Sequence, residues 1–504
     1  MESEYPSSEE IALQYLDQLP WPPYPFQEQA ILSWFDSEDG LLVCAPTGTG
    51  KTVIAETALF EALQTGRKAY YTTPLIALTE QKFHELQDSA ERWGFAREDV
   101  GLVTGNRRVN PDAAILVVVA EILLNRLLSP DDFRFDDVSA VVMDEFHSFN
   151  DPERGIVWEL SLGMLPKNVR VLLISATVGN APEFVMWLNK QHNRTLRLLQ
   201  SEERRVPLSF RWVIDELLSD QLQLLAAGED EERYTPALVF CFNRAECWST
   251  AEQLKGKNLL ASGQQKALQV EMEQMDWSIG AGGKLKQILI RGVGIHHAGL
   301  LPKYRLLVER LAQKGMLKLI VGTDTLGVGI NVPIRTVLFT QLCKYDGTSV
   351  RSLSNREFAQ IAGRAGRKGF DDEGTVWVQA PEHVIENLRA EEKAARKEGK
   401  KSKKVVKKKP PERGYSHWNE DTFNRIVNGA PEPLISSFSV NHQMEQLKLK
   451  RMELLQLYTP NHPFVQTINS KIKVIQDEMD GIKAHIRNLP QSDKTAVTLL
   501  RDVK

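Results

Sequence analysis

Short apolar runs alternate with amphipathic segments from about Leu41 to Gln379. The runs are rich in Val, Ile and Leu without strict alternation, which is typical of strands buried on both faces of a parallel sheet. They form two blocks, one ending near Asn189 and one beginning near Val206. The pattern therefore predicts an α/β fold with two parallel sheets flanked by helices. The expected strands are Leu41–Ala45, Lys68–Thr73, Ala114–Val119, Ala140–Met143, Val169–Ile174, Ala237–Phe242, Gly294–His297, Lys318–Val321, Thr336–Phe339 and Thr375–Val378.

The pattern changes beyond Pro381. Residues Lys393–Lys409 are Lys-rich and poor in apolar side chains, which predicts a solvated loop or linker. Near the C-terminus, apolar residues recur at alternating spacings of three and four, as in a coiled-coil seam. A helix over Met444–Tyr458 precedes this seam, and the Pro-containing segment Thr459–Pro463 separates the two. We expect a helical hairpin that pairs with itself, with a partner or with a second copy. The seam residues are Val465, Ile468, Ile472, Ile475, Met479, Ile482, Ile486 and Leu489.

Composition is that of a globular protein, but charge is unevenly distributed. The 504 residues are 42% hydrophobic and 25% charged, with a net charge of −4. These values exclude collagen-like, mucin-like and wholly disordered chains. Residues Glu391–Arg413 hold eleven basic and four acidic side chains, a net of +7, so the remainder carries −4 − 7 = −11. One basic segment is thus joined to an otherwise acidic protein.

The four cysteines and the N-terminus indicate an intracellular environment. None of the cysteines forms a C-x-x-C pair, and no spacing matches a zinc finger. The opening sequence MESEYPSSEE has no apolar core of a secretory signal. The longest apolar stretch, Ala113–Leu124, is too short to span a bilayer. We expect a cytoplasmic protein with no membrane segment.

A phosphate-binding loop is the strongest chemical signal. The sequence Ala45-Pro-Thr-Gly-Thr-Gly-Lys51-Thr52 follows an apolar strand and leads into a helix that we expect to begin at Val53. Glycines let successive backbone N–H groups turn toward phosphate oxygens, and a helix N-terminus adds its dipole. Lys51 would reach the β- and γ-phosphates of ATP, and the Thr52 hydroxyl would ligate Mg²⁺. The residues that would surround the phosphates are Thr47, Gly48, Thr49 and Gly50.

An acidic pair ends another apolar run, Val141-Val-Met-Asp144-Glu145-Phe-His147. Ligands of open α/β sheets bind at the carboxyl ends of the strands, where these two carboxylates are expected to lie. Asp144 would hold Mg²⁺, and Glu145 would polarise the attacking water. The sequence spacing leaves the role of His147 open, with a link between ATP hydrolysis and a neighbouring motif as one possibility.

Two further motifs complete the chemistry. Ser175-Ala-Thr177 follows an apolar strand, and Gln360-Ile-Ala-Gly-Arg364-Ala-Gly-Arg367-Lys-Gly369 carries two arginines three residues apart. That spacing predicts that Arg364 and Arg367 share one face of a helix, from which they would stabilise charge on the transferred γ-phosphate.

In combination, these motifs resemble superfamily 2 helicases of the DExH type, and within them the superkiller/exosome-associated branch, in particular a bacterial subgroup. Pro25-Phe-Gln27 resembles the adenine-reading Q motif, and Thr73–Leu78 resembles motif Ia. Thr104-Gly-Asn106 and Ala120-Glu-Ile-Leu123 resemble motifs Ib and Ic. Asp144–Gly155, Gly294–Pro302 and Gly322–Pro333 continue the series, so that the resemblance covers about residues 20–440.

The resemblance implies a role for each matching residue. Gln27 would read the adenine edge, with Trp21 or Tyr24 either as a stacking surface or as ordinary packing. His147, Ser175 and Thr177 would couple hydrolysis to movement. The second domain would contribute Gly329, Asn331 and Gln360 to the nucleotide site. The strand of nucleic acid would be gripped through its phosphates and sugars, without base reading, by Pro74, Thr104, Gly105, Glu121, Thr323 and Thr325.

The chain departs from the family pattern after about residue 440. Glu432–Met444 resembles the start of the family's winged-helix region, but the heptad hairpin follows in place of a helical ratchet. We therefore predict four parts: an N-terminal extension with RecA-like domain 1 (1–198), RecA-like domain 2 (199–385), a Lys-rich linker with a partial family segment (386–440) and the hairpin tail (441–504). The Lys-rich segment is a solvated linker, a phosphate-backbone anchor or a docking site for an acidic partner.

These motifs support an ATP- and Mg²⁺-dependent helicase that acts on single-stranded nucleic acid, with RNA favoured over DNA. The family implies 3′-to-5′ polarity. The alternatives are a DNA helicase and a nucleotide-gated binding scaffold that lacks processive unwinding.

Overall fold

The computed structural model describes residues 6–151, 154–226, 234–254, 259–261, 263–323, 332–345, 350–395, 407–411 and 416–436, with a few residues between 451 and 473. The chain forms two compact units, which are described separately. Unit 1 comprises Met1–Pro46, Gly50–Glu202 and Glu432–Lys504, and unit 2 comprises Thr47–Thr49 and Glu203–Pro431. The chain thus leaves unit 1 after Glu202 and returns to it at Glu432.

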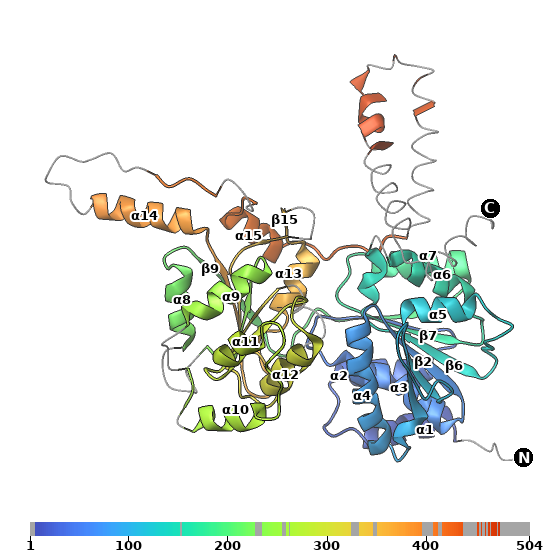
Figure 1. The fold of residues 1–504 in the computed structure, drawn as a ribbon. Helices are drawn as coiled ribbons and strands as arrows, with labels where there is room; N and C mark the ends of the chain where they lie inside the picture. Colours follow the sequence, from blue (N-terminus) through green and yellow to red (C-terminus); the bar gives the residue numbers. More distant parts are fainter. Residues whose placement is uncertain are drawn as a thin grey trace, which may run out of the picture. The chain divides into compact units, whose positions relative to one another are not determined.

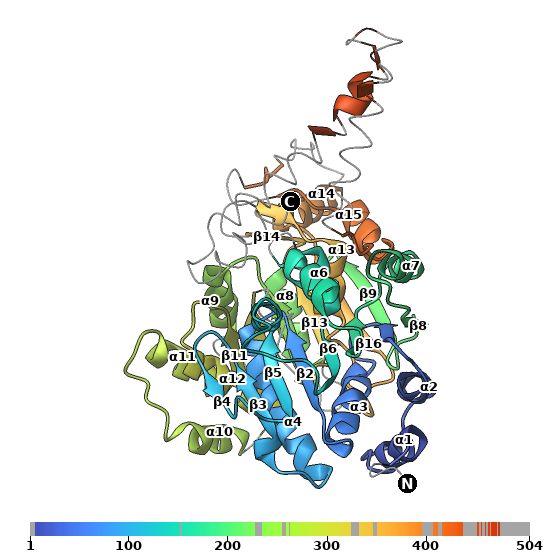
Figure 2. The ribbon, with the colours of Figure 1, turned by 90° about the vertical axis from the view of Figure 1, so that its right-hand side faces the viewer.

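Unit 1 is built on an eight-stranded sheet in the order β4-β3-β5-β2-β6-β7-β1-β8 (Figure 2). Only the β3–β4 pair is antiparallel, so the carboxyl ends of all strands except β4 lie along one edge of the sheet. The strands are β1 (Gly40–Cys44), β2 (Lys68–Thr73), β3 (Val100–Val103), β4 (Arg108–Val109), β5 (Ile115–Val119), β6 (Val138–Met143), β7 (Arg170–Ser175) and β8 (Arg197–Gln200).

Helices cover both faces of this sheet (Figure 1). One core cluster joins α1–α4 to alternate strand residues such as Leu41, Ala69 and Ile115, and the opposite cluster joins α5–α7 to Leu42, Tyr70 and their neighbours. Burial on both faces explains why the strands read as continuous apolar runs. The helices are α1 (Ser8–Asp17), α2 (Pro25–Phe35), α3 (Lys51–Gln64), α4 (Ile76–Arg92), α5 (Ala120–Leu127), α6 (Gly155–Met164) and α7 (Ala181–His192), with the 3₁₀ turns η1 (Arg97–Asp99) and η2 (Phe146–Asn150).

Unit 2 has a six-stranded parallel sheet in the order β11-β12-β10-β13-β16-β9. These strands are β9 (Leu208–Val213), β10 (Ala237–Phe240), β11 (Val293–His296), β12 (Leu319–Gly322), β13 (Thr336–Phe339) and β16 (Gly374–Gln379), and a separate hairpin pairs β14 (Cys343–Tyr345) with β15 (Val350–Ser352). Its helices are α8 (Leu218–Ala226), α9 (Arg244–Gln253), α10 (Gln264–Met272), α11 (Gly282–Leu289), α12 (Pro302–Gln313), α13 (Asn355–Ala362), α14 (Glu382–Ala395) and α15 (Glu420–Val427).

The fold confirms the α/β class and the two mainly parallel sheets flanked by helices. All ten expected strands are present, with ends shifted by a few residues. The missed strands are short or lie at or near sheet edges, where fewer apolar contacts leave a weaker pattern. The first helix after the glycine loop begins at Lys51 rather than Val53.

The C-terminal predictions lie mostly outside the described residues. This holds for the helix over Met444–Tyr458 and for most of the heptad seam. Within the Lys-rich segment, Lys393 to Ala395 belong to α14, so the prediction of a loop is wrong for these residues. The four cysteines are buried and free. No helix in the described part of the chain is both long and apolar enough to cross a membrane.

Candidate functional site

Six predicted motifs meet at the carboxyl edge of the unit 1 sheet, in a spatial order that differs from their order in sequence. Thr104 follows β3, Glu121 lies two residues after β5 in the first turn of α5, and Pro74 follows β2. Asp144 follows β6, Ser175 ends β7, and the glycine loop follows β1. Since these strands are neighbours in the order β3-β5-β2-β6-β7-β1, the residues predicted to bind nucleic acid occupy one half of the edge. The residues predicted to bind ATP occupy the other half.

The glycine loop has the backbone of a phosphate cradle. Gly48 and Gly50 adopt left-handed conformations, with φ of 89° and 74°, which turn N–H groups toward one point. The N-terminus of α3 begins directly afterwards, at Lys51. The Lys51 ammonium donates to the carbonyl oxygens of Ala45 (2.6 Å) and Pro46 (2.9 Å), and so lies over the loop. This geometry fits a nucleotide phosphate group.

Gln27 is tied to the same loop. Its side chain is 1% exposed, accepts from the Tyr24 backbone N–H (3.1 Å) and donates from Nε2 to the Gly50 carbonyl oxygen (3.0 Å). The glutamine predicted to read adenine therefore contacts the phosphate loop directly. Trp21 is about half exposed, and Tyr24 lies at the start of α2.

The acidic pair is held in place by polar contacts. The Tyr71 hydroxyl donates to Asp144 Oδ2 (2.5 Å), and the Glu145 backbone N–H donates to Asp144 Oδ1 (2.9 Å). Burial, together with the neighbouring Glu145 carboxylate, raises the pKa of Asp144. A carboxylate and the Thr52 hydroxyl are the hard oxygen donors that Mg²⁺ prefers, so the residues present fit that ion.

His147 joins the acidic pair to Ser175-Ala-Thr177. Its Nδ1 accepts from the Ala176 backbone N–H (3.4 Å), and its Nε2 lies 3.3 Å from Glu145 Oε2. Because Nδ1 is an acceptor, the ring proton is on Nε2 and points to Glu145. The β1–β7 register also places Cys44 beside Ser175, which brings the glycine loop next to the same segment. Thr177 is two residues further along, partly buried.

Lys82 is a buried cation that sequence analysis missed. It lies on α4, is 8% exposed, and its ammonium is 2.8 Å from Glu85 Oε2 and 3.3 Å from Thr52 Oγ1. Burial alone would lower its pKa, but the carboxylates of Glu85 and Asp144 outweigh burial and raise it. The position of Lys82 within an amphipathic helix gave no sign that its ammonium reaches Thr52, a predicted Mg²⁺ ligand.

Arg154 is a second residue that sequence analysis missed. It lies beside residues that are predicted to bind nucleic acid. Its guanidinium donates to the Pro74 carbonyl oxygen, and its Nε lies 3.7 Å from Glu121 Oε1. It therefore links the predicted motifs Ia and Ic. In the third motif, Thr104 forms a tight turn around Gly105, with its N–H and hydroxyl bonded to the backbone of Arg107. Gly105 has no atom within 4 Å of the position a Cβ would take.

The arginine motif differs from the helical prediction. Helix α13 ends at Ala362, so Arg364 and Arg367 lie in the turns beyond it rather than on one helical face. Gly366 has a φ of 90°, and a Cβ there would lie 2.5 Å from Val206 Cγ1. This left-handed residue, and the isolated bridge of Ala365 to Ile334, are incompatible with a helix that runs through both arginines.

Arg367 is bound by an acid of its own loop. Its Nε and Nη2 donate to the two Asp371 oxygens (2.9 and 2.8 Å), and its backbone N–H donates to Oδ2 (2.8 Å). These bonds outweigh the effect of burial and lower the pKa of Asp371. Within unit 2, Gln360 lies on α13 and Thr323 directly follows β12. The predicted residues Thr325, Gly329 and Asn331 lie outside the described residues.

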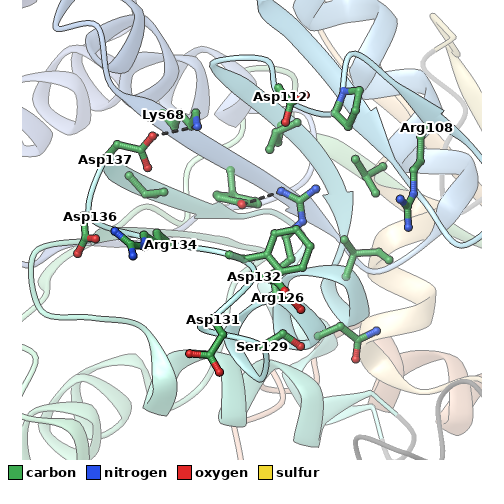
Figure 3. Close-up of a pocket in the computed structure, with 18 residues that line it drawn as sticks. Lys68, Arg108, Asp112, Arg126, Ser129, Asp131, Asp132, Arg134, Asp136 and Asp137 are labelled. Carbon is green, nitrogen blue, oxygen red and sulfur yellow. Dashed lines mark hydrogen bonds and ion pairs between the residues drawn. The ribbon is translucent and has the colours of Figure 1, made fainter.

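A cavity of about 880 Å³ lies in unit 1, lined by none of the predicted site residues. Figure 3 shows Arg126 in its middle, where the guanidinium donates to the Tyr70 hydroxyl (2.8 Å) and lies 4.7 Å from the centre of the Phe133 ring. The rim carries Lys68, paired with Asp137 at 2.9 Å. Hydrogen bonding and the aromatic faces account for the burial of Arg126.

Comparison with known families gives three matches along the chain. Residues 24–185 match the DEAD/DEAH box helicase family, and residues 216–369 match the helicase conserved C-terminal domain. Residues 380–483 match a domain of unknown function, DUF3516. The chain therefore carries the two RecA-like domains of a DEAD/DEAH box helicase, followed by a third region whose family has no assigned function.

Several curated relatives of this chain are named as helicases. The uncharacterized helicase C17H9.02 of Schizosaccharomyces pombe is 32% identical over 484 residues, which cover 86% of this chain and 45% of the yeast protein. The human superkiller complex protein 2 is 33% identical over 414 residues (70% and 32%). The human exosome RNA helicase MTR4 is 32% identical over 410 residues (71% and 38%). The chain spans less than half the length of these relatives.

Proposed function

We propose that this chain is an ATP- and Mg²⁺-dependent RNA helicase of the superkiller/exosome-associated branch, in a bacterial subgroup of it, moving 3′ to 5′ along a single strand. The observation that supports the proposal is that the motifs predicted to bind ATP and those predicted to bind nucleic acid lie on separate halves of one sheet edge. Similarity to relatives named as RNA helicases supports RNA as the substrate.

Each residue of the proposed nucleotide site in unit 1 has a distinct role. The backbone from Thr47 to Gly50 and the Lys51 ammonium bind the phosphates of ATP, while Gln27 reads adenine. Thr52 and Asp144 would hold Mg²⁺, which would neutralise phosphate charge. Glu145 orients and polarises the attacking water. The Nε2–H group of His147 holds that carboxylate, while Nδ1 of the same ring bonds the Ser175-Ala-Thr177 segment.

The second helicase domain completes the proposed site. Gly329, Asn331 and Gln360 would contact the nucleotide, and Arg364 and Arg367 would stabilise charge on the γ-phosphate. In this role Arg367 must exchange its bonds to Asp371 for bonds to phosphate. Pro74, Thr104, Gly105, Glu121, Thr323 and Thr325 would hold phosphates and sugars, so binding would be independent of base sequence.

The remaining parts of the proposal concern organisation. We propose that the chain divides into four parts at residues 198, 385 and 440. We also propose that the C-terminal hairpin associates with a second copy or binds a protein, and that the protein is cytoplasmic. The Lys-rich segment would anchor phosphate backbone, as its charge supports.

One experiment tests substrate and coupling together. ATP hydrolysis is measured alone, with single-stranded RNA and with DNA of the same length and sequence, and displacement of a labelled strand is measured in parallel. We expect RNA to stimulate hydrolysis more than DNA, with ATP-dependent displacement. Stronger stimulation by DNA would indicate the DNA helicase. Stimulation without displacement at any enzyme concentration would indicate a nucleotide-gated scaffold.

A further inference from the structure

The residues that return to unit 1 form a densely bonded segment, here called the return segment (residues 432–436). Backbone groups of Glu432, Pro433, Leu434 and Ile435 all hydrogen bond to unit 1, and the Ser436 hydroxyl donates to Glu159 Oε1. Leu434 is 3% exposed and belongs to the same core cluster as Phe146 and Phe149 of η2. This segment is therefore an integral part of unit 1, although it follows unit 2 in sequence.

Two asparagine side chains clamp the return segment. Asn150 donates to the Pro433 carbonyl oxygen (2.5 Å) and accepts from the Ile435 N–H (2.9 Å). Asn180 donates to the Leu434 carbonyl oxygen (2.8 Å) and accepts from the Leu434 N–H (2.6 Å). An asparagine amide satisfies a backbone donor and acceptor at once, so each clamp fixes position and direction.

The two clamps stand directly after catalytic motifs. Asn150 ends η2, five residues after Glu145, and Asn180 lies three residues after Thr177. Asn180 also occupies the N-cap of α7, yet its side chain makes no capping hydrogen bond. An N-cap asparagine ordinarily accepts a hydrogen bond from a free backbone N–H in the first turn of its helix. Here that bond is replaced by the clamp on Leu434.

A short connection joins the return segment to unit 2. Helix α15 is anchored there, with Phe423 and Ile426 in the unit 2 core and the Phe423 ring 5.7 Å from that of Trp212. Only residues 428–431 separate Val427 from Glu432, a span of at most about 18 Å. Pro431 and Pro433 restrict the residues before them to extended conformations, so the connection is stiff as well as short.

We propose that residues 428–436 form a tether that transmits movements of unit 2 to the loops after the acidic pair and after Ser175-Ala-Thr177, with Asn150 and Asn180 as positioning residues. The tether gives a mechanical role to part of the region that matches DUF3516. Both ends of the tether are anchored. When the units move apart by more than the length of the tether, the return segment is therefore placed under tension. The bonds of Glu432 to Gly179 and of the segment to the two asparagines would carry this tension toward the loops that hold Glu145 and Thr177. This inference rests on the proposed function.

Slackening the tether tests the proposal without touching a bond of the return segment. Gly-Ser-Gly-Ser is inserted between Ala430 and Pro431, which adds about 13 Å of reach. The matched control carries the same insertion between Lys409 and Pro410. We expect stimulation of ATP hydrolysis by single-stranded RNA to fall at least about fivefold, with the KM for ATP, the unstimulated rate and the Tm unchanged. The control insertion should keep full stimulation.

A second pair of variants loosens the anchor itself. Ile435→Pro removes the N–H that donates to Asn150, whereas Ile435→Ala keeps it and changes only a side chain that is 49% exposed. We expect Ile435→Pro alone to lose stimulation, with an unchanged KM for ATP. A purely structural segment would lower Tm without this selective loss in kcat.

The outcomes separate the two proposals. If the wild-type chain hydrolyses ATP but neither RNA nor DNA stimulates it, the proposed function fails. If the wild-type chain is stimulated and the slackened and Ile435→Pro proteins are stimulated equally, the tether inference fails while the proposed function stands.

Discussion

At the scale of single residues, the site depends on buried charges that compensate one another. Asp144 and Glu85 face Lys82, while Tyr71 and the Glu145 N–H bond Asp144. Burying a carboxylate is costly unless such partners are present. These partners offset part of the cost of burying Asp144, although burial and the Glu145 carboxylate still raise its pKa.

Glu145→Gln should abolish hydrolysis while ATP still binds. The amide keeps the size of the side chain but cannot polarise water, and the phosphate contacts of Lys51 and the glycine loop are untouched. Measured turnover should fall by at least about 10²-fold, with the ATP Kd within a few-fold of wild type. Near-normal turnover would exclude the role assigned to Glu145.

Lys82→Met should destabilise the protein at neutral pH by roughly 1–3 kcal/mol, because Glu85 and Asp144 lose their buried partner. The raised pKa of Lys82 means that its contribution is complete below its unfolded pKa of about 10.4 and is lost as pH rises through the folded value. Thermal unfolding at several pH values should show that the difference in stability between wild type and variant becomes smaller at alkaline pH.

Lys68→Met is the matched control for this change. The Lys68 side chain is 41% exposed and pairs with an exposed Asp137, and such surface pairs contribute little. Equal losses of Tm in the two variants would contradict a special role for Lys82.

At the scale of elements, the backbone conformation of the glycine loop is linked to Gln27, the residue proposed to read adenine. Gly50 holds a φ of 74°, and a Cβ added there would lie 2.5 Å from Gln27 Nε2. Only glycine allows both the left-handed turn and the Gln27 contact. The Q-motif helix α2 and the loop are therefore one structural element, although 23 residues separate Gln27 from Gly50.

Gly50→Ala should lower the ATP affinity by about tenfold and the stability by about 1–2 kcal/mol. Gly94→Ala is the control, because Gly94 also has a positive φ, 85°, but an added Cβ meets open space. Both variants should lose similar stability by thermal unfolding, and only Gly50→Ala should weaken ATP in a binding titration. Equal ATP affinities would show that the Gln27 contact is dispensable.

At the scale of the whole molecule, positive charge is concentrated in the Lys-rich segment. Residues Lys393–Lys409 contain ten basic residues and one acidic residue. Two of them pair with glutamates of α14, Lys407 with Glu391 at 2.8 Å and Lys408 with Glu386 at 2.6 Å. These exposed pairs are weak enough to exchange for phosphate.

Replacing Lys393–Lys409 by a Gly-Ser linker of the same length should weaken RNA binding and flatten its salt dependence. Each lost phosphate contact lowers the slope of log K against log salt by roughly 0.7 on a single strand. Titrations of labelled RNA at several salt concentrations measure this slope. An unchanged slope would leave the segment as a linker, and ATP hydrolysis without RNA should be unaffected in either case.

The sequence by itself determined which elements form and what chemistry they carry. Ten strands, the glycine loop and the acidic pair follow from local apolar runs and from residue types a few positions apart, and local backbone preferences act over that range. The failure at Arg364 and Arg367 has the same origin. Their spacing suited a helix, but Gly366 packs against Val206, a contact that no local pattern contains.

Tertiary structure alone decided how these elements meet. Strand pairing sets the order of the motifs along the sheet edge, and it brings Lys82 to Thr52 and Arg154 to Pro74. It also places the return segment on Asn150, 283 residues from Pro433 in sequence. Such contacts depend on which strands and helices bury one another's faces, a property of the assembled core rather than of any one stretch of chain.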